Sequence, residues 1–270
     1  MTRGDQIIKA RRPLHTDCAN VLGVRVDAIN MDLAIGAINS TLESGIKGYI
    51  CVTGVHGVME SQRDFVLKEI INNAFLVTPD GMPTVWVGKL QGYSQIGRVY
   101  GPDLMLEVCR MSVEKGYSHF IYGGKIGVAE ELATKLNELF PGIKITGTYT
   151  PPFEPLTKDE ELKVVKLVNG GKPDIIWVGL STPKQEKFMA EFIHKLETKV
   201  MLGVGAAFDV HTGHINDAPI WMKNTGLQWL HRLWQEPRRL LKRYLINNPK
   251  FIYKISLQFL GAKKYSLSTR

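Results

Sequence analysis

Short apolar runs alternate with helical patterns along the first 210 residues of the chain. The runs are long enough for strands, and they occupy residues 21–29, 49–53, 74–77, 119–122, 144–148, 174–180 and 199–204. Between most of them, apolar side chains recur every three or four residues, as on the buried face of a helix. Strands that alternate with helices in this way are typical of a parallel sheet covered by helices. We therefore predict an α/β fold.

Two helix starts support this division. Asn30 precedes a helical pattern that begins at Met31, and an asparagine there can cap the first turn. Pro102 lies where the first turn of a helix tolerates proline, and that helix is expected to end near Lys115.

After residue 215 the pattern changes to consecutive helices with no strand between them. We expect breaks near Pro237 and Pro249, because proline interrupts a helix interior. Between these prolines, leucines and a tyrosine recur at helical spacing, with basic residues at the intervening positions. No apolar segment approaches the roughly 20 residues that span a bilayer. We predict a flexible leader (1–20), a catalytic core (21–215) and a basic amphipathic appendage (216–270) that lies on a membrane.

The positive charge is concentrated in that appendage. Residues 221–270 contain eleven Lys and Arg and a single acidic residue, Glu236. The preceding 220 residues contain 23 basic and 25 acidic side chains. A cationic tail on a near-neutral body suits an anionic lipid surface, a nucleic acid or a diphosphate, and a solvated helix without a partner is the plain alternative.

The three cysteines are widely spaced and form no CxxC pair. This spacing predicts neither a disulfide framework nor a zinc site, and it favours a reducing compartment.

Polar residues gather where the predicted strands end, which is where open α/β sheets bind ligands. Thr53 ends one strand and His56 follows it, although a lone histidine is more often structural than catalytic. Asp80 closely follows another strand and precedes a helix. An Asp-Gly pair is by default a turn, but a carboxylate placed here could also act as a general base.

Two further junctions favour phosphate. Gly123 and Gly124 stand between a strand and a helix, where free backbone N–H groups attract a phosphate or diphosphate. The segment from Gly179 through Lys184 and Gln185 combines a strand end, a cap and a proline in the first helical turn, and simple capping is the alternative. Neither junction has a GxGxxG or Walker A spacing, so neither identifies the ligand.

Five ordered segments resemble the WecG/TagA/CpsF family, glycosyltransferase family twenty-six, across roughly residues 20–248. They are Thr78-Pro79-Asp80-Gly81, Arg98-Val99-Tyr100-Gly101-Pro102-Asp103-Leu104, residues 179–186, residues 204–222, and residues 226–244 with Glu236-Pro237-Arg238-Arg239. The resemblance implies a Rossmann-like α/β core with a C-terminal helical appendage that docks on a membrane and closes the site. It also implies inverting transfer of a sugar from a UDP-sugar to a polyprenyl-diphosphate-linked saccharide in cell-surface polysaccharide assembly.

Site roles follow from the same resemblance. Asp80 is expected to be the catalytic base, and the substrate-binding residues are expected to be Thr53, His56, Arg98, Asp103 and Gln185. The UDP-binding residues are expected to be Gly123, Gly124, Gly179, Lys184, Gln185, Arg232 and Arg238. The family does not require a divalent metal, and the chain has no DxD-type motif, so no cofactor and no metal are expected.

The donor sugar stays open between an N-acetylmannosamine type, glucose and a uronic acid. The expected partners are the UDP-sugar, the lipid-linked acceptor and an anionic membrane surface, with no nucleic acid; a homo-oligomer is compatible with the sequence. The expected location is the cytoplasmic face of the cell membrane. Two alternatives are a nucleotide-dependent oxidoreductase, for which residues 21–31 lack the glycine fingerprint, and a non-enzymatic membrane- or nucleic-acid-binding module.

Overall fold

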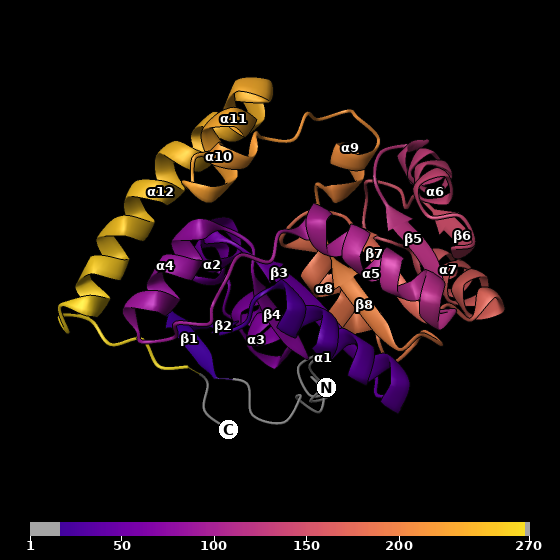
Figure 1. The fold of residues 1–270 in the computed structure, drawn as a ribbon, viewed down its shortest axis with the longest axis horizontal. Coiled ribbons are helices and arrows are strands. Elements are labelled where there is room, and N and C mark those ends of the chain that lie inside the picture. Colours follow the sequence, from indigo (N-terminus) through magenta and orange to yellow (C-terminus); the bar gives the residue numbers. More distant parts are fainter. Residues whose placement is uncertain (1–16, 268–270) are drawn as a thin grey trace.

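A six-stranded parallel sheet forms the centre of the protein in the computed structural model, which describes residues 17–267 (Figure 1). The strand order is β4-β3-β8-β7-β5-β6. The strands are β3 (Gly48–Thr53), β4 (Leu76–Pro79), β5 (Ser118–Gly123), β6 (Lys144–Tyr149), β7 (Ile175–Gly179) and β8 (Val200–Gly203). The predicted α/β fold with a parallel sheet core is therefore confirmed.

Helices cover both faces of this sheet, and each face has its own apolar core. One face packs on α2 (Val55–Ser61), α3 (Phe65–Asn73), α7 (Lys158–Gly171) and α8 (Lys184–Phe192). The other face packs on α1 (Met31–Ser44), α5 (Gly101–Lys115), α6 (Val128–Leu139) and α9 (Ala207–His211). Side chains on the sheet are fully buried, as Trp177 on β7 illustrates. Such burial on both faces explains the nearly continuous apolar runs in the strand sequences.

The two predicted helix starts are correct. The side chain of Asn30 accepts a hydrogen bond from the backbone N–H of Leu33 at 3.0 Å, which caps α1. Pro102 lies in the first turn of α5.

The prediction of one strand over residues 21–29 was wrong. The segment instead contributes to a separate antiparallel hairpin of β1 (Cys18–Val21) and β2 (Val24–Asp27). Leu22 and Gly23 both adopt positive φ and turn the chain between the strands. Arg25 and Asp27 form a buried ion pair at 2.6 Å, and Asp27 accepts a hydrogen bond from the backbone of Val77. The pair thereby fastens the hairpin to β4. β1 begins within the segment predicted as a leader, and residues 1–16 of that leader lie outside the described residues.

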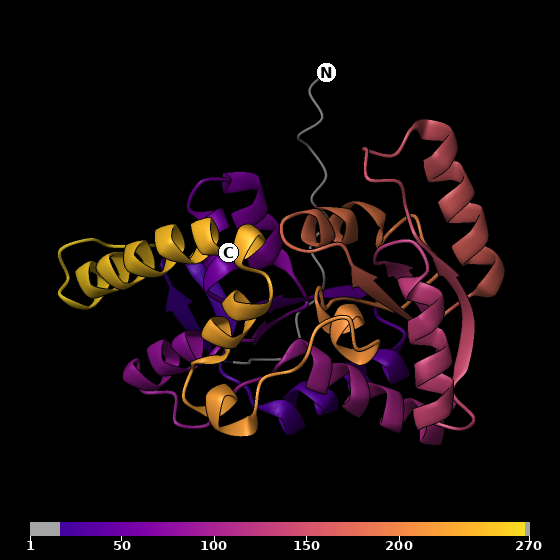
Figure 2. The ribbon, with the colours of Figure 1, turned by 90° about the horizontal axis from the view of Figure 1, so that it is seen from above.

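The C-terminal part is helical, as predicted, and comprises α10 (Ile220–Asn224), α11 (Gln228–Gln235) and α12 (Pro237–Phe259). Figure 2 shows these helices together on one side of the sheet. The predicted break at Pro249 does not occur, because α12 continues through it. Asn247 and Phe251, on either side of the proline, are buried against the core, and this packing outweighs the lost backbone hydrogen bond. None of the helices in residues 17–267 combines the length and the apolar character that crossing a bilayer demands.

Candidate active site

A cleft of about 1150 Å³ lies beyond the carboxyl ends of β3, β4, β7 and β8. Residues that follow these four strands form its floor, while α4 (Met82–Leu90) and the helices α10 to α12 form its walls. This is the edge at which parallel α/β sheets bind ligands, because their strands all end there. The cleft therefore joins the core and the C-terminal helices in one cavity.

Asp80 lies on the core side of this cleft, in the turn between β4 and α4. Its backbone N–H donates to the carbonyl of Thr53 at 3.2 Å, which ties the ends of β3 and β4 together. One carboxyl oxygen, Oδ1, accepts a hydrogen bond from the backbone N–H of Gly101 at 3.3 Å, at the start of α5. Burial raises the pKa of Asp80, although Arg98, the Gly101 N–H and Arg232 act against that rise. A carboxylate of raised pKa that faces a cavity is a good proton acceptor.

Arg98 supports the Asp80 turn from behind. Its Nε donates to the backbone carbonyl of Asp80 at 2.9 Å, and its guanidinium lies 4.2 Å from the centre of the Tyr100 ring. A terminal nitrogen of the guanidinium, Nη2, donates a hydrogen bond to the side-chain oxygen of Gln228 at the start of α11. Arg98 therefore connects the candidate base to the C-terminal helices.

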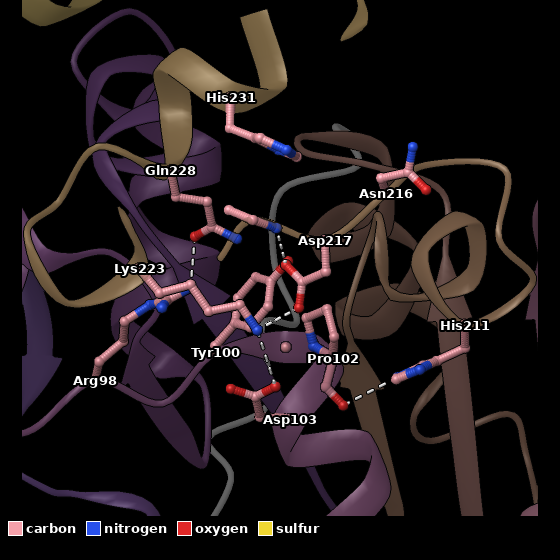
Figure 3. A network of polar contacts seen from close by, with 12 residues as sticks. Arg98, Tyr100, Pro102, Asp103, His211, Asn216, Asp217, Lys223, Gln228 and His231 are labelled. Carbon is pink, nitrogen blue, oxygen red and sulfur yellow. Dashed lines mark hydrogen bonds and ion pairs between the residues drawn. The ribbon is translucent and has the colours of Figure 1, made fainter. Parts of the chain in front are cut away.

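A second set of polar contacts holds α10 against the core (Figure 3). Lys223 forms an ion pair with Asp217 and lies 3.7 Å from a carboxyl oxygen of Asp103. The hydroxyl of Tyr100 donates to Asp217 at 3.1 Å, and burial raises the pKa of Tyr100. We call Lys223, Asp217, Tyr100 and Asp103 the α10 clasp. Asp103 belongs to this clasp and does not line the cleft.

Three arginines of α11 and α12 also line this cleft: Arg232, Arg239 and Arg243. Glu236 pairs with Arg232 at 3.0 Å and also with Arg239. The Nε of Arg232 is buried and has no hydrogen-bond partner among residues 17–267. Burial and the nearby Arg239 lower the pKa of Arg243. Glu236 pairs with two of these three guanidiniums, so the cluster carries more positive than negative charge and favours a bound anion. Arginine can bind phosphate oxygens in a bidentate manner.

His56 lies in α2 on the cleft wall. Burial, with a contribution from Arg243, lowers its pKa to about 4. Its Nδ1 lies 3.4 Å from the side-chain amide of Asn247 in α12. His56 is therefore neutral at pH 7, and it links α2 to α12.

Gln185 reaches the cleft from the start of α8. Its amide nitrogen donates to buried Glu186 at 3.1 Å, and that carboxyl also accepts a hydrogen bond from Thr182. Burial raises the pKa of Glu186. The amide oxygen of Gln185 is buried without a hydrogen-bond partner in the described part of the chain. It is therefore oriented by Glu186 and has an acceptor position available to a ligand.

The structure thus brings five predicted site residues to one cavity, namely His56, Asp80, Arg98, Gln185 and Arg232. Thr53 lies directly behind the wall, buried, with its hydroxyl 3.4 Å from the carbonyl of Cys51. Lys184 and Arg238 lie outside the lining: Lys184 donates to the carbonyl of Phe153, and Arg238 is on the exposed side of α12.

The predicted phosphate-binding glycines are packed against each other and do not line the cleft. The N–H of Gly124 donates to the carbonyl of Gly179 at 3.0 Å. A Cβ on Gly123 would lie 2.7 Å from that carbonyl oxygen, and one on Gly179 would lie 2.7 Å from the Phe208 ring. Close packing at the ends of β5 and β7 thus accounts for these glycines.

Sequence reasoning missed several cleft residues. Arg239 and Arg243 are four residues apart, so they share a helix face, which is a pattern that the sequence displays. The role of Gln228 depends on a contact across 130 positions of sequence, and no local pattern indicates it. In residues 17–267 the structure contains no group of three or more His, Cys, Asp or Glu side chains arranged to hold a metal ion.

The names of two relatives of the chain specify an activity. The chain is 29% identical over 221 residues to the N-acetylglucosaminyldiphosphoundecaprenol N-acetyl-beta-D-mannosaminyltransferase of Bacillus subtilis (strain 168), a match that covers 82% of this chain and 79% of the relative. It is 28% identical over 231 residues to the protein of the same description from Bacillus spizizenii (strain ATCC 23059 / NRRL B-14472 / W23), covering 84% of this chain and 87% of that one.

The wider family is also evident. A model of the glycosyl transferase WecG/TagA/CpsF family matches residues 19–265, which include the hairpin, the sheet, the cleft and the C-terminal helices. The match covers nearly the whole chain, so the protein belongs to the WecG/TagA/CpsF family of glycosyltransferases.

Proposed function

We propose that the protein is an inverting glycosyltransferase that moves a sugar from a UDP-sugar to a saccharide on a polyprenyl diphosphate. One observation carries this proposal: Asp80, on the core side, and a cluster of arginines on the C-terminal helices line the same cleft. Glycosyl transfer from a nucleotide diphosphate needs both a proton acceptor and cations. The two Bacillus relatives, whose names specify a diphosphoundecaprenol-linked acceptor, support the lipid-linked acceptor.

In the proposed reaction, an acceptor hydroxyl attacks the anomeric carbon of the donor. The new C–O bond forms on the face opposite the bond between the sugar and UDP. That bond breaks, and UDP leaves with its electron pair. The hydroxyl proton passes to the carboxylate of Asp80, whose raised pKa makes it a stronger base than an ordinary aspartate. The Gly101 N–H and the contact of Arg98 with the Asp80 carbonyl hold that carboxylate in place.

Departure of UDP develops negative charge on the diphosphate. Arg232 is the best-placed cation, because it lines the cleft and its buried Nε has no hydrogen-bond partner in residues 17–267. A preorganised donor of this kind stabilises developing charge more than water does. We propose that side-chain cations serve this purpose without a divalent metal, so a chelator such as EDTA should leave turnover unchanged.

The sugar pocket is assigned to the side of the cleft next to Gln185. Its free amide oxygen and the neutral imidazole of His56 offer hydrogen bonds to sugar hydroxyl or amide groups. The proposal includes an N-acetylmannosamine type, glucose or a uronic acid as the donor sugar. The acidic donor would need a cation near Gln185, whereas the neutral sugars would not.

The C-terminal helices suit the surface of a membrane. Large apolar side chains are exposed there, among them Trp221, Trp234 and Leu245, and they alternate with basic residues. Such a helix lies in the interface between lipid and water, where its cations meet anionic headgroups. We propose a peripheral location on the cytoplasmic face of the cell membrane.

The test is a UDP-release assay with purified protein. UDP-N-acetylmannosamine, UDP-glucose and a UDP-uronic acid are each supplied with a polyprenyl-diphosphate saccharide, with and without EDTA. We expect acceptor-dependent UDP release with one donor, a product extended by one sugar with the opposite anomeric configuration, and no effect of EDTA. Retention of configuration would overturn the inverting mechanism, and no release with any donor would overturn the proposed substrate class.

A further inference from the structure

The cleft continues beyond its charged end as an apolar groove between α4 and α12. Trp86, Val87 and Leu90 form one side, and Ile252, Ile255 and Phe259 form the other. Both helices line the same cavity, and Figure 1 shows α12 at the outer edge of the molecule. We call these six residues the α4–α12 groove.

The groove is built from two helix faces that leave a cavity between them. Trp86 and Leu90 are four residues apart, and Ile252, Ile255 and Phe259 follow at spacings of three and four, so each set shares one face. Several of these side chains remain exposed, Leu90 at 73% and Ile252 at 63%. Ile255 packs against the core and forms the floor. A continuous, exposed apolar surface of this kind indicates a binding site for an apolar ligand.

The charges on α12 show what that ligand is attached to. Arg239 and Arg243 line the same cleft, about three and a half and two and a half helical turns before the groove begins at Ile252. From Arg243 to Ile252 the helix rises by about 14 Å, at 1.5 Å per residue. Along α12, a ligand in the cleft would therefore meet guanidiniums first and an apolar channel about 14 Å further on, while Asp80 lies on the core side of the same cleft.

This order matches a molecule with a sugar, a diphosphate and a hydrocarbon chain. We propose that the α4–α12 groove binds the first isoprene units of the acceptor, with its diphosphate at Arg239 and Arg243. The inference rests on the proposed function, because it takes a polyprenyl diphosphate as the acceptor. The protein then recognises the lipid chain itself, in addition to any contact with the bilayer.

Acceptors with tails of different length distinguish binding of the tail in the groove from docking of the protein on a membrane. The same saccharide diphosphate is prepared with a single isoprene unit and with several units, and turnover is measured in detergent micelles without a bilayer. The groove variants are Leu90→Glu and Ile252→Glu. The matched control is Tyr253→Glu, because Tyr253 is adjacent on α12 and similarly exposed at 66% but does not line the cleft.

We expect the wild-type enzyme to have a lower KM for the longer tail. Each groove variant should raise that KM by about tenfold, because each buried methylene contributes several-fold to affinity. KM for the single-isoprene acceptor should rise much less in these variants, because one unit fills only the start of the groove, and Tyr253→Glu should change neither value. Equal KM values for both tails in the wild type, or an equal rise in KM in Tyr253→Glu, would overturn the proposal that the groove binds the isoprene units.

Failure of the groove and failure of the proposed function give different results. Normal turnover without any preference for tail length refutes only the groove, whereas no turnover with either acceptor refutes the transferase. A readout independent of turnover is a prenyl diphosphate with a photoreactive isoprene unit. Its crosslinks should fall within residues 86–90 and 252–259, and crosslinks confined to the outer face around Tyr253 would contradict the proposal.

Discussion

The α/β core and the C-terminal helices contribute to one cleft but are held in place differently. The core has two apolar layers with many fully buried side chains, and strands such as β7 are buried on both faces. α10 and α11 contain no buried residue among those described, and α12 buries only Leu240, Asn247 and Phe251. The position of α10 and α11 therefore depends largely on specific polar contacts.

This difference separates the two chemical tasks. Asp80 is placed by the ends of β3 and β4, which are parts of the sheet. Arg232, Arg239 and Arg243 are placed by helices that meet the core mainly through polar contacts. These include the α10 clasp, the Arg98–Gln228 bond, the contacts of Asn247 and the hydrogen bond of Gln258 to Asn20 of β1, while α12 adds a few buried side chains. Regions with few buried apolar contacts open most easily. We infer that the base is fixed while the cationic wall is the part able to move aside for substrates.

The largest effect should come from removing the base. Asp80→Asn keeps the shape and the contact with the Gly101 N–H but cannot accept the proton, so kcat should fall by about 10³-fold, within the usual range for a general base. The measurement is steady-state UDP release with the acceptor present. Asp209→Asn, in α9 and outside the cleft lining, is the control and should retain activity. An active Asp80→Asn enzyme would remove the base assignment.

The cationic wall should have the next largest effect. Arg232→Ala removes the best-placed cation from the leaving diphosphate and should lower kcat/KM by about 10²-fold. Arg238→Ala is the matched control, because Arg238 lies on the exposed side of the same helical region and outside the lining. Equal losses in both variants would show a general effect of charge, such as membrane attraction, and would contradict a specific role for Arg232.

Loosening the α10 clasp should have a smaller effect. Lys223→Met leaves Asp217 and Asp103 without their cation, and we expect kcat/KM to fall by about tenfold, equivalent to roughly 1.4 kcal/mol. The core should be unaffected, so the thermal unfolding midpoint should change little. Lys242→Met, at an exposed position of α12, is the comparison and should behave like the wild type. A large fall in the unfolding midpoint of Lys223→Met would instead show that the α10 clasp stabilises the core, and would contradict a role limited to positioning α10.

The pH dependence sharpens the assignment of the base. Only ionised Asp80 accepts a proton, so kcat/KM should fall as the pH is lowered through its pKa. Because burial raises that pKa, the fall should begin at a higher pH than an ordinary aspartate would give. Burial lowers the pKa of His56 to about 4, so the imidazole is neutral near pH 7 and is not the expected base. His56→Gln should therefore keep the position of the acidic limb. A limb that disappears in His56→Gln would assign the titration to the histidine.

The sequence predicts the core well because its strands and helices follow local patterns. The runs at residues 119–122 and 174–180 lie within or around β5 and β7, since apolar strands buried on both faces are conspicuous in a sequence. The hairpin was missed although Gly23 interrupts its apolar run, which is a typical turn signal. Leu22 also adopts positive φ, and nothing about a leucine indicates that.

The site was only partly predictable for a related reason. Asp80 and Gln185 lie at strand ends, and the family motifs identify them. On α12, Arg238 was chosen in place of Arg239 and Arg243, because the face of a helix that meets the core depends on tertiary contacts. Those contacts include the burial of Asn247 and Phe251, and they also carry α12 straight through Pro249. No local sequence pattern determines which face of α12 meets the core.

The central claim is that the core supplies the base and the C-terminal helices bind the diphosphate, and measurements of UDP binding test it most directly. Calorimetry would compare the wild type, Asp80→Asn and Arg232→Ala in the absence of divalent metal. We predict that Asp80→Asn binds UDP as the wild type does while failing to transfer, and that Arg232→Ala loses about tenfold or more in affinity, because a charged contact to the diphosphate is removed. Unchanged UDP affinity in Arg232→Ala, or a loss of affinity confined to Asp80→Asn, would contradict the account.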